Sequence, residues 1–292
     1  MIREFLQRPL RPESDHARAK TTSRFESTAI IDHRDLVSTH FRQYPVLYVD
    51  LKDVHGTTFE DMQTSFDAIV IRILKDLSNP IDGVLDQNFL LFCDQLYHEQ
   101  GLLHPRGTVL QVISQILQRV FIMPVVVLID EYDTPIHSAI EHNYADLASD
   151  FFATVFGSLL KNNDAVYASM MVGIWKVAKS GWLSQLNHLE IFPMHAEDDR
   201  YAKFFLFTEE EVEILCNAHE RVLSIEALQP HYNGYAARCS SGFVKLYNPF
   251  SVVRALGRKK ISNYWVETEN IRRCRKTFGA LVQGFVITLI SF

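Results

Sequence analysis

The run Val125-Val126-Val127-Leu128-Ile129-Asp130-Glu131 decides the fold class of this chain. The apolar part of the run is typical of a strand that is buried on both faces of a parallel sheet. Open parallel sheets bind their ligands outside the carboxyl ends of the strands. The run therefore predicts that Asp130 and Glu131 lie at a ligand-binding edge. An ordinary buried strand with a charged exit explains the same pattern, so both readings stay open at this point.

The flanking sequence extends this strand into an alternating α/β pattern. Residues 46–51 and 165–174 are also mostly apolar, and we expect them to form strands. Helices are expected where apolar residues recur every three or four positions. They are predicted over residues 59–77, 86–99, 107–120 and 143–161. Strand, helix and strand at this spacing make a βαβ unit, so the sequence predicts an α/β fold with a parallel sheet.

The chain divides into three parts by its residue composition and its hydrophobic periodicity. Residues 1–28 are rich in Arg, Pro, Ser and Asp without a clear period, so we expect a poorly ordered segment unless it packs on the core. Residues 29–200 are predicted to form the α/β core. Residues 201–292 are predicted to form a smaller, mostly helical and truncated appendage. Its helices are expected after Thr208, in a capping motif, and after Asn248-Pro249.

Composition limits the classes of partner and compartment. The net charge of −6 gives no overall attraction to nucleic acid or anionic lipid. The cysteines are scattered without a CxxC pair, which favours reduced thiols over disulfides or a zinc site. The first ten residues lack the apolar core of a secretory signal. The apolar stretch 278–290 is shorter than the about 20 residues that span a bilayer. We expect an intracellular protein, cytoplasmic or nuclear, that does not enter a membrane.

Other residue combinations carry weaker chemical signals. Cys216 and His219 share a helix face, but no second ligand pair accompanies them, and core packing explains them better. The sequence contains neither an HExxH zinc motif nor a GxSxG nucleophile elbow. The basic stretches 258–260 and 272–276, with aromatic residues between them, suit either a solvated helix face or a nucleic-acid surface. The acidic total charge favours the solvated face.

Four sequence motifs, taken in order, resemble those of the AAA-ATPase-like family, which often precedes a PD-(D/E)XK nuclease-like region. The motifs are Tyr44-Pro45-Val46-Leu47-Tyr48-Val49-Asp50, Leu128-Ile129-Asp130-Glu131-Tyr132-Asp133-Thr134-Pro135-Ile136, Ser180-Gly181-Trp182-Leu183-Ser184-Gln185-Leu186-Asn187-His188-Leu189 and Tyr247-Asn248-Pro249-Phe250-Ser251-Val252. Each motif is weak alone, but their combined order is specific. The resemblance implies a three-layer P-loop NTPase-like core with ATP and Mg²⁺ as its cofactors.

The resemblance also implies roles for particular residues. Asp130 would be the Walker B acid that holds Mg²⁺ on the nucleotide, and Glu131 would be the catalytic acid that polarises the attacking water. Lys176 or Ser180 would read the γ-phosphate after a sensor strand, although a solvated surface lysine explains Lys176 equally well. Asp133 is a further ligand or, as we prefer, a solvated loop carboxylate or helix cap.

The phosphate-binding loop of the family is not matched here. The family pattern Phe-Leu-x-Arg-Pro-Arg-Arg-Phe-Gly-Lys-Ser begins correctly at Phe5 and then loses its glycine and lysine before Ser14. Glycine lets successive N–H groups face the anion, and lysine neutralises the phosphate charge. Pro12 removes an N–H group, and Glu13 places a negative charge where phosphate would lie.

We therefore expect an AAA-ATPase-like protein that binds nucleotide weakly and hydrolyses little or no ATP. Two alternatives stay open. One is a non-enzymatic interaction or regulatory module that keeps only the fold, and the other is a fragment of an ATPase–nuclease protein. The expected partners are nucleotide and either another protein or a second copy of the chain. Nucleic acid stays open as a partner but is not favoured.

Overall fold

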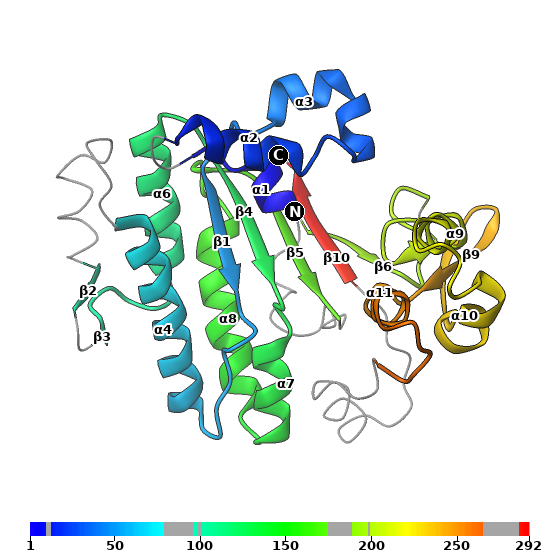
Figure 1. Ribbon diagram of the computed structural model, residues 1–292. Coiled ribbons are helices and arrows are strands. Elements are labelled where there is room, and N and C mark those ends of the chain that lie inside the picture. Colours follow the sequence, from blue (N-terminus) through cyan, green and yellow to red (C-terminus); the bar gives the residue numbers. More distant parts are fainter. Residues whose placement is uncertain are drawn as a thin grey trace. The chain divides into compact units, whose positions relative to one another are not determined.

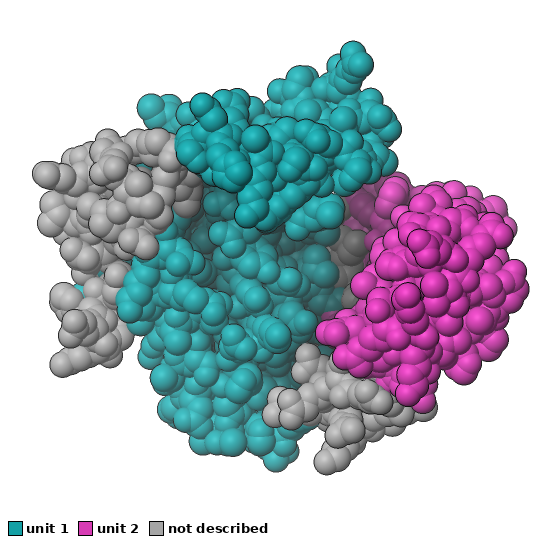
Figure 2. All heavy atoms as spheres, viewed as in Figure 1, with its two compact units in different colours: residues 1–173, 177–190, 288–292 teal, residues 174–176, 191–287 magenta. Residues whose placement is uncertain are grey.

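The computed structural model describes residues 1–9, 13–78, 96–98, 101–174, 189–197, 199–264 and 286–291. The chain divides into two compact units (Figure 2). Unit 1 comprises residues 1–173, 177–190 and 288–292, and unit 2 comprises residues 174–176 and 191–287. The division falls near Ile174 and Ile191, and the last residues of the chain return to unit 1.

Unit 1 is built on a sheet whose central strands are parallel (Figure 1). Strand β4 (Val125–Asp130) lies between β1 (Val46–Asp50) and β5 (Val166–Gly173), and β10 (Val286–Ser291) follows β5 in the strand order. The register places Asp50 opposite Asp130 and Tyr48 opposite Leu128. The predicted α/β class with a parallel sheet is confirmed. The strands end where the apolar runs meet a charged residue or a glycine.

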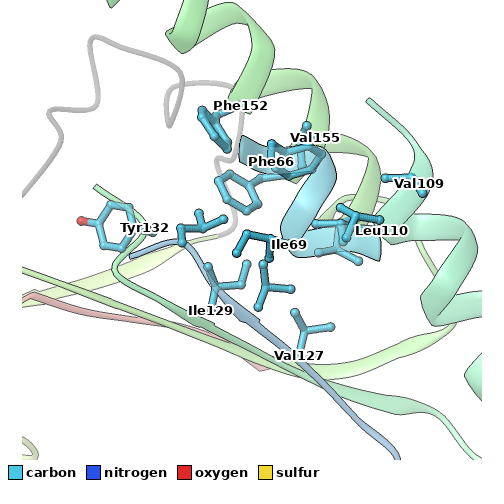
Figure 3. Close-up of a cluster of buried hydrophobic side chains, with 14 of the residues drawn as sticks. Phe66, Ile69, Val109, Leu110, Val127, Ile129, Tyr132, Phe152 and Val155 are labelled. Carbon is cyan, nitrogen blue, oxygen red and sulfur yellow. The ribbon is translucent and has the colours of Figure 1, made fainter. Parts of the chain in front are cut away.

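Three long helices bury one face of this sheet (Figure 1). They are α4 (Phe59–Ser78), α6 (Val109–Phe121) and α8 (Ala145–Leu160). Their apolar stripes meet the alternate strand residues of this face, such as Val127 and Ile129. Figure 3 shows Phe66 of α4 and Phe152 of α8 within this cluster. This packing is the main core of unit 1.

The opposite face of the sheet has a smaller apolar cluster. Its buried centre is Val46, Val126 and Leu128, and the partly buried residues packed against it include Leu6 and Met170. Leu6 belongs to α1 (Ile2–Leu6), so the N-terminal segment contributes to the cover of this face. A complete third layer, as the resemblance implies, stays an expectation.

The N-terminal segment folds into short helices that pack through aromatic side chains. They are α1, α2 (Asp15–Ser23), the 3₁₀ helix η1 (Ala29–Asp32) and α3 (Arg34–His40). The rings of Phe5, Phe25 and Phe41 contact one another with centroid separations of 5.2–5.5 Å. Phe25 is only 2% exposed, so this segment meets the condition of packing on the core. Pro9 lies between the end of α1 and the start of α2.

Two further elements of unit 1 were not predicted. Helix α7 (Thr134–Glu141) follows directly after β4, and a short antiparallel pair joins β2 (Tyr97–His98) to β3 (Gly101–Leu102). The helix predicted over 86–99 lies mostly outside the described residues. Thr58 caps α4, because its Oγ1 accepts the Asp61 N–H at 3.1 Å.

Unit 2 combines short helices with a small antiparallel sheet. Its helices are α9 (Glu209–Ala218), α10 (Ile225–Tyr232) and α11 (Pro249–Arg258). Strands β7 (Phe207–Thr208), β9 (Gly242–Tyr247) and β8 (Tyr235–Cys239) form its sheet in that order. Strand β6 (Glu190–Pro193) begins at the border of the two units. The helices after Thr208 and Asn248 agree with the sequence, whereas the sheet was missed.

Two of the cysteines lie within the described residues. Cys216 and Cys239 are free and buried, while Cys93 and Cys274 lie outside the described residues. Among the helices that the structure describes, none has the length and apolar character needed to cross a bilayer.

Candidate functional site

The carboxyl end of β4 delivers Asp130 to the edge of the sheet, as the sequence predicted. Val125–Ile129 are buried, and Asp130 is half-buried as the last residue of the strand. Its Oδ1 accepts the N–H of Glu131 at 3.0 Å, and its Oδ2 accepts the hydroxyl of Tyr48 at 3.2 Å. Both carboxylate oxygens are thus oriented by protein donors. Each oxygen keeps lone-pair capacity for a further partner.

Glu131 lies directly after the strand in a left-handed backbone conformation. Its φ of 54° is uncommon for a residue other than glycine, and such backbone is often found at functional sites. The carboxylate accepts the hydroxyl of Thr134 at 2.8 Å through Oε2. The chain therefore turns sharply at Glu131 and directs this side chain to the first turn of α7. The Asp130 carboxylate contacts Tyr48 of β1, whereas the Glu131 carboxylate contacts Thr134 of α7.

Tyr48 and Asp50 of β1 join Asp130 at this edge, and the sequence reasoning missed both. Asp50 is the register partner of Asp130, so the two carboxylates lie on the same face of neighbouring strands. Burial, together with the charges of Asp130 and Asp50, raises the pKa of Tyr48 to about 12. Tyr48 stays protonated at neutral pH and donates to Asp130. The sequence carried a signal for this edge, because Asp50 and Asp130 each lie at the end of an apolar run that is expected to form a strand.

Asp133 occupies the N-cap position of α7, one of the two preferred interpretations, but it is not the solvated carboxylate of the other, and its side chain makes no capping hydrogen bond. It is 1% exposed and is the residue that precedes the first turn of α7. Its Oδ2 lies 3.7 Å from Nε2 of His137 on the next turn. Burial lowers the pKa of His137 to about 4, so the imidazole is neutral at pH 7. A Cβ atom at the nearby Gly173 of β5 would clash with the buried Asp133 carboxylate, so this position has no room for a side chain.

Hydrogen bonds join the loop after β1 to the side chains of α7 and of the start of α8, and they hold the edge of the sheet in place. Ser138 Oγ donates to the carbonyl of Gly56 at 3.1 Å, and the Tyr144 hydroxyl donates to the same carbonyl at 2.8 Å. Thus the carboxyl ends of β1 and β4 are held in a fixed relation by side chains that are themselves buried.

The structure does not place the remaining predicted site residues. Lys176 and Ser180 lie outside the described residues. Glu13 forms an ion pair with Arg42, and Ser14 caps α2 by accepting the N–H of Ala17 at 3.2 Å. In the region where the family has its phosphate loop, the described side chains therefore have structural roles.

The donor set fits a weakly held, hydrated Mg²⁺ better than a metal bound by protein alone. Across the residues that the structure describes, no group of three or more His, Cys, Asp and Glu side chains is placed to hold a metal ion. Asp130, with Asp50 beside it, offers oxygen ligands of the kind that Mg²⁺ prefers. Mg²⁺ commonly takes one or two carboxylates and completes its shell with water and phosphate.

A cavity of about 890 Å³ lies beside β1, and its lining includes Tyr48 and Asp50. Its lining residues include Arg3, Val46, Tyr48, Asp50, Ile73 and Leu77. Arg3 Cζ lies 5.0 Å from the centre of the Tyr48 ring, in a cation–π contact. Neither Asp130 nor Glu131 is among the described residues that line this cavity. It is therefore separate from the two predicted acids, although it borders them through Tyr48.

Comparison with known proteins identifies the family of this chain. A family model described as "Predicted AAA-ATPase" matches residues 13–183. The chain belongs to this family. The match covers β1, β4 and β5 and includes Asp130 and Glu131. It begins at residue 13, after Phe5 and Pro9.

A curated relative gives no further function for this AAA-ATPase-like chain. It is an uncharacterized protein in the vnfD 5' region of Azotobacter chroococcum mcd 1, and it is 30% identical over 146 residues. The aligned part covers 49% of this chain and 27% of that protein, so the chain spans much less than the full length of the relative. No solved structure matches the chain.

Proposed function

We propose that this chain is a nucleotide-binding AAA-ATPase-like domain that binds Mg²⁺-nucleotide weakly and turns over little or no ATP. The observation that carries the proposal is the position of Asp130 and Glu131 at the carboxyl end of β4, between the parallel strands β1 and β5. Family membership over this region supports a P-loop NTPase-like core with Asp130 as its Walker B acid.

Asp130 would hold Mg²⁺, with Asp50 beside it and the Tyr48 hydroxyl fixing its orientation. Bound Mg²⁺ would neutralise phosphate charge. Glu131, which follows Asp130 in the chain and whose carboxylate accepts from Thr134, would act as the general base. Lys176 and Ser180 remain part of the proposal as residues that contact the γ-phosphate.

Weak binding follows from the degraded phosphate loop. Between Phe5 and Ser14 the sequence has no glycine and no lysine, so the N–H groups and the ammonium that cradle phosphate are missing there. Each charge-assisted hydrogen bond that is lost costs about 1.5–3 kcal/mol, so the affinity for nucleotide falls by orders of magnitude.

Titration with a fluorescent ATP analogue in the presence and absence of Mg²⁺ tests this proposal. We expect binding that depends on Mg²⁺ and that Asp130→Asn weakens by about tenfold or more, because a carboxylate ligand is lost. Asp150→Asn is the matched control, since Asp150 is exposed on α8. Hydrolysis that Glu131→Gln abolishes would contradict the inactive assignment. Equal affinities of the Asp130→Asn and Asp150→Asn variants would remove Asp130 from the site.

The second candidate is a non-enzymatic interaction module. One observation favours it: both oxygens of Asp130 already accept hydrogen bonds from Tyr48 and Glu131. A chain that shows no Mg²⁺-dependent nucleotide binding in the same titration belongs to this class.

A further inference from the structure

The outer edge of β1 can be identified from hydrogen bonds on both sides of the strand. On the inner side, the carbonyl of Pro45 accepts from Val126 at 3.0 Å, and the N–H of Leu51 donates to Asp130 at 3.0 Å. Odd-numbered residues of β1 therefore direct their backbone groups toward β4. Because backbone groups alternate along a strand, the N–H and C=O groups of Val46, Tyr48 and Asp50 point to the opposite, outer edge.

The N-terminal segment already pairs with the beginning of this outer edge. The N–H of Tyr44 donates to Leu6 at 3.0 Å, and the carbonyl of Tyr44 accepts from Arg8 at 2.7 Å. These two bonds form one step of a parallel ladder, with Gln7 opposite Tyr44. The step ends at Pro9, which has no N–H group to continue a ladder.

Beyond this step the outer edge of β1 faces the cavity. Val46, Tyr48 and Asp50, whose backbone groups point outward, all line it. Within the described residues no backbone partner pairs with these three on that side. Natural proteins usually cover or charge such edges, because an open row of N–H and C=O groups is a template for another strand.

The walls of the cavity give the chemistry of its occupant. On the α4 side, Ile73 and Leu77 offer apolar surface beside Arg72 and Asp76. On the side of the N-terminal segment, Glu4 and Glu13 are already paired with Arg24 and Arg42. Arg3 donates through Nε to the neutral amide of Gln7 at 2.8 Å and lies over the Tyr48 ring. An extended segment beside β1 would direct alternate side chains to these two walls. Apolar residues suit the α4 wall, and acidic residues suit Arg3.

We propose that this cavity binds an extended segment of a partner protein, which adds to the sheet as a strand beside β1. The segment continues the edge where the Gln7–Tyr44 step ends, and its backbone pairs with Val46, Tyr48 and Asp50. Apolar residues alternate with acidic residues along it. The outward-facing part of β1 is about 16 Å long, which accommodates about five extended residues. This interaction requires neither nucleotide nor Asp130, so it stands apart from the proposed function.

Hydrogen exchange of the full chain with and without synthetic octapeptides tests the proposal. The probes are two matched series in which apolar residues alternate with Glu or with Lys. In the free protein we expect fast exchange at Val46, Tyr48 and Asp50 and slow exchange at Leu47 and Val49. The Glu series should slow the even-numbered amides at least tenfold and leave the odd-numbered ones unchanged, because only outward N–H groups gain acceptors.

Backbone and charge controls separate strand addition from non-specific binding. N-methylation of the peptide at alternate residues should abolish binding in one register and preserve it in the other, since only one edge faces β1. The Glu series should bind about tenfold more tightly than the Lys series, and Arg3→Gln should remove most of that preference.

Three results would each overturn the proposal. The first is slow exchange of the even-numbered amides in the free protein at every concentration, which would mean that the chain itself covers this edge. The second is failure of both peptide series to bind. The third is binding without protection of Val46, Tyr48 and Asp50. The nucleotide titration is unaffected by any of them, so the two proposals fail separately.

Discussion

At the scale of single residues, the carboxyl edge of the sheet depends on polar groups held by burial and by short hydrogen bonds. Asp130 is oriented by donors from two elements, the Tyr48 hydroxyl and the Glu131 N–H. The sequence predicted the place of Asp130 but not its orientation. Tyr48 comes from a strand that lies far away in sequence, and only the register of β1 against β4 brings it near.

His137 makes a residue-scale contribution to pH dependence. Its folded-state pKa of about 4 is below the ordinary value of 6.5, because burial disfavours the charged imidazole. As pH falls below about 6.5, the unfolded chain takes up the proton first, so the folded state loses stability progressively down to pH 4. The expected loss is on the order of 2–3 kcal/mol.

Urea unfolding of the wild type and of His137→Gln between pH 7 and pH 4 measures this effect. The variant should show a smaller loss of stability over this range, whatever its stability at pH 7. His142→Gln changes an exposed histidine nearby and should retain the wild-type slope. Identical slopes in all three proteins would show that His137 is protonated equally in the folded and unfolded states.

At the scale of elements, periodicity predicted the long helices and the central strands because their burial is nearly complete. Helix α6 and strand β4 follow the sequence patterns closely. Helix α7 was missed because Thr134–Glu141 is short and begins at once after the acidic turn. The predicted solvated state of Asp133 was wrong for the same reason, since α7 and β5 enclose that turn.

The junction of β5 with this turn gives an element-scale prediction. A Cβ atom at Gly173 would lie 2.5 Å from Asp133 Oδ1 and 2.7 Å from the Tyr132 ring. Both neighbours are buried and have little room to move, so Gly173→Ala should destabilise unit 1 by about 1–3 kcal/mol. At Gly157 of α8 a Cβ atom meets nothing within 4 Å, so Gly157→Ala should stabilise the protein by about 0.5–1 kcal/mol.

Thermal denaturation of the two alanine variants checks this pair. They carry the same chemical change, so opposite shifts in Tm isolate the effect of the local space. A higher Tm for Gly173→Ala would mean that the close approach of β5 to Asp133 does not exist in solution. A lower Tm for Gly157→Ala would mean that α8 has no room for a methyl group at that position.

At the scale of the whole molecule, the fold class and the family could be inferred from the sequence, whereas the cavity and the antiparallel sheet of unit 2 could not. The cavity is assembled from α1, α2, β1 and α4, and no local pattern encodes their meeting. Exposed residues interrupt the buried ones along β8 and precede them along β9. Their apolar signal is therefore weaker than that of β4.

The separate cores of the two units lead to a prediction for the whole chain. The main core of unit 1 includes Leu117, and a core of unit 2 includes Leu256; both side chains are almost fully buried. Truncation of either leucine to alanine leaves a cavity that costs about 2–5 kcal/mol. Because the two side chains belong to different clusters, we expect each variant to weaken its own unit.

Native-state hydrogen exchange of the full chain measures this separation. Leu256→Ala should accelerate exchange of the α9 and α11 amides by at least tenfold and leave the β4 amides within about twofold of the wild type. Leu117→Ala should do the reverse. If either substitution accelerated exchange equally in α11 and β4, the two units would unfold as one cooperative body, and local stability at the Asp130 edge would depend on residues throughout the chain.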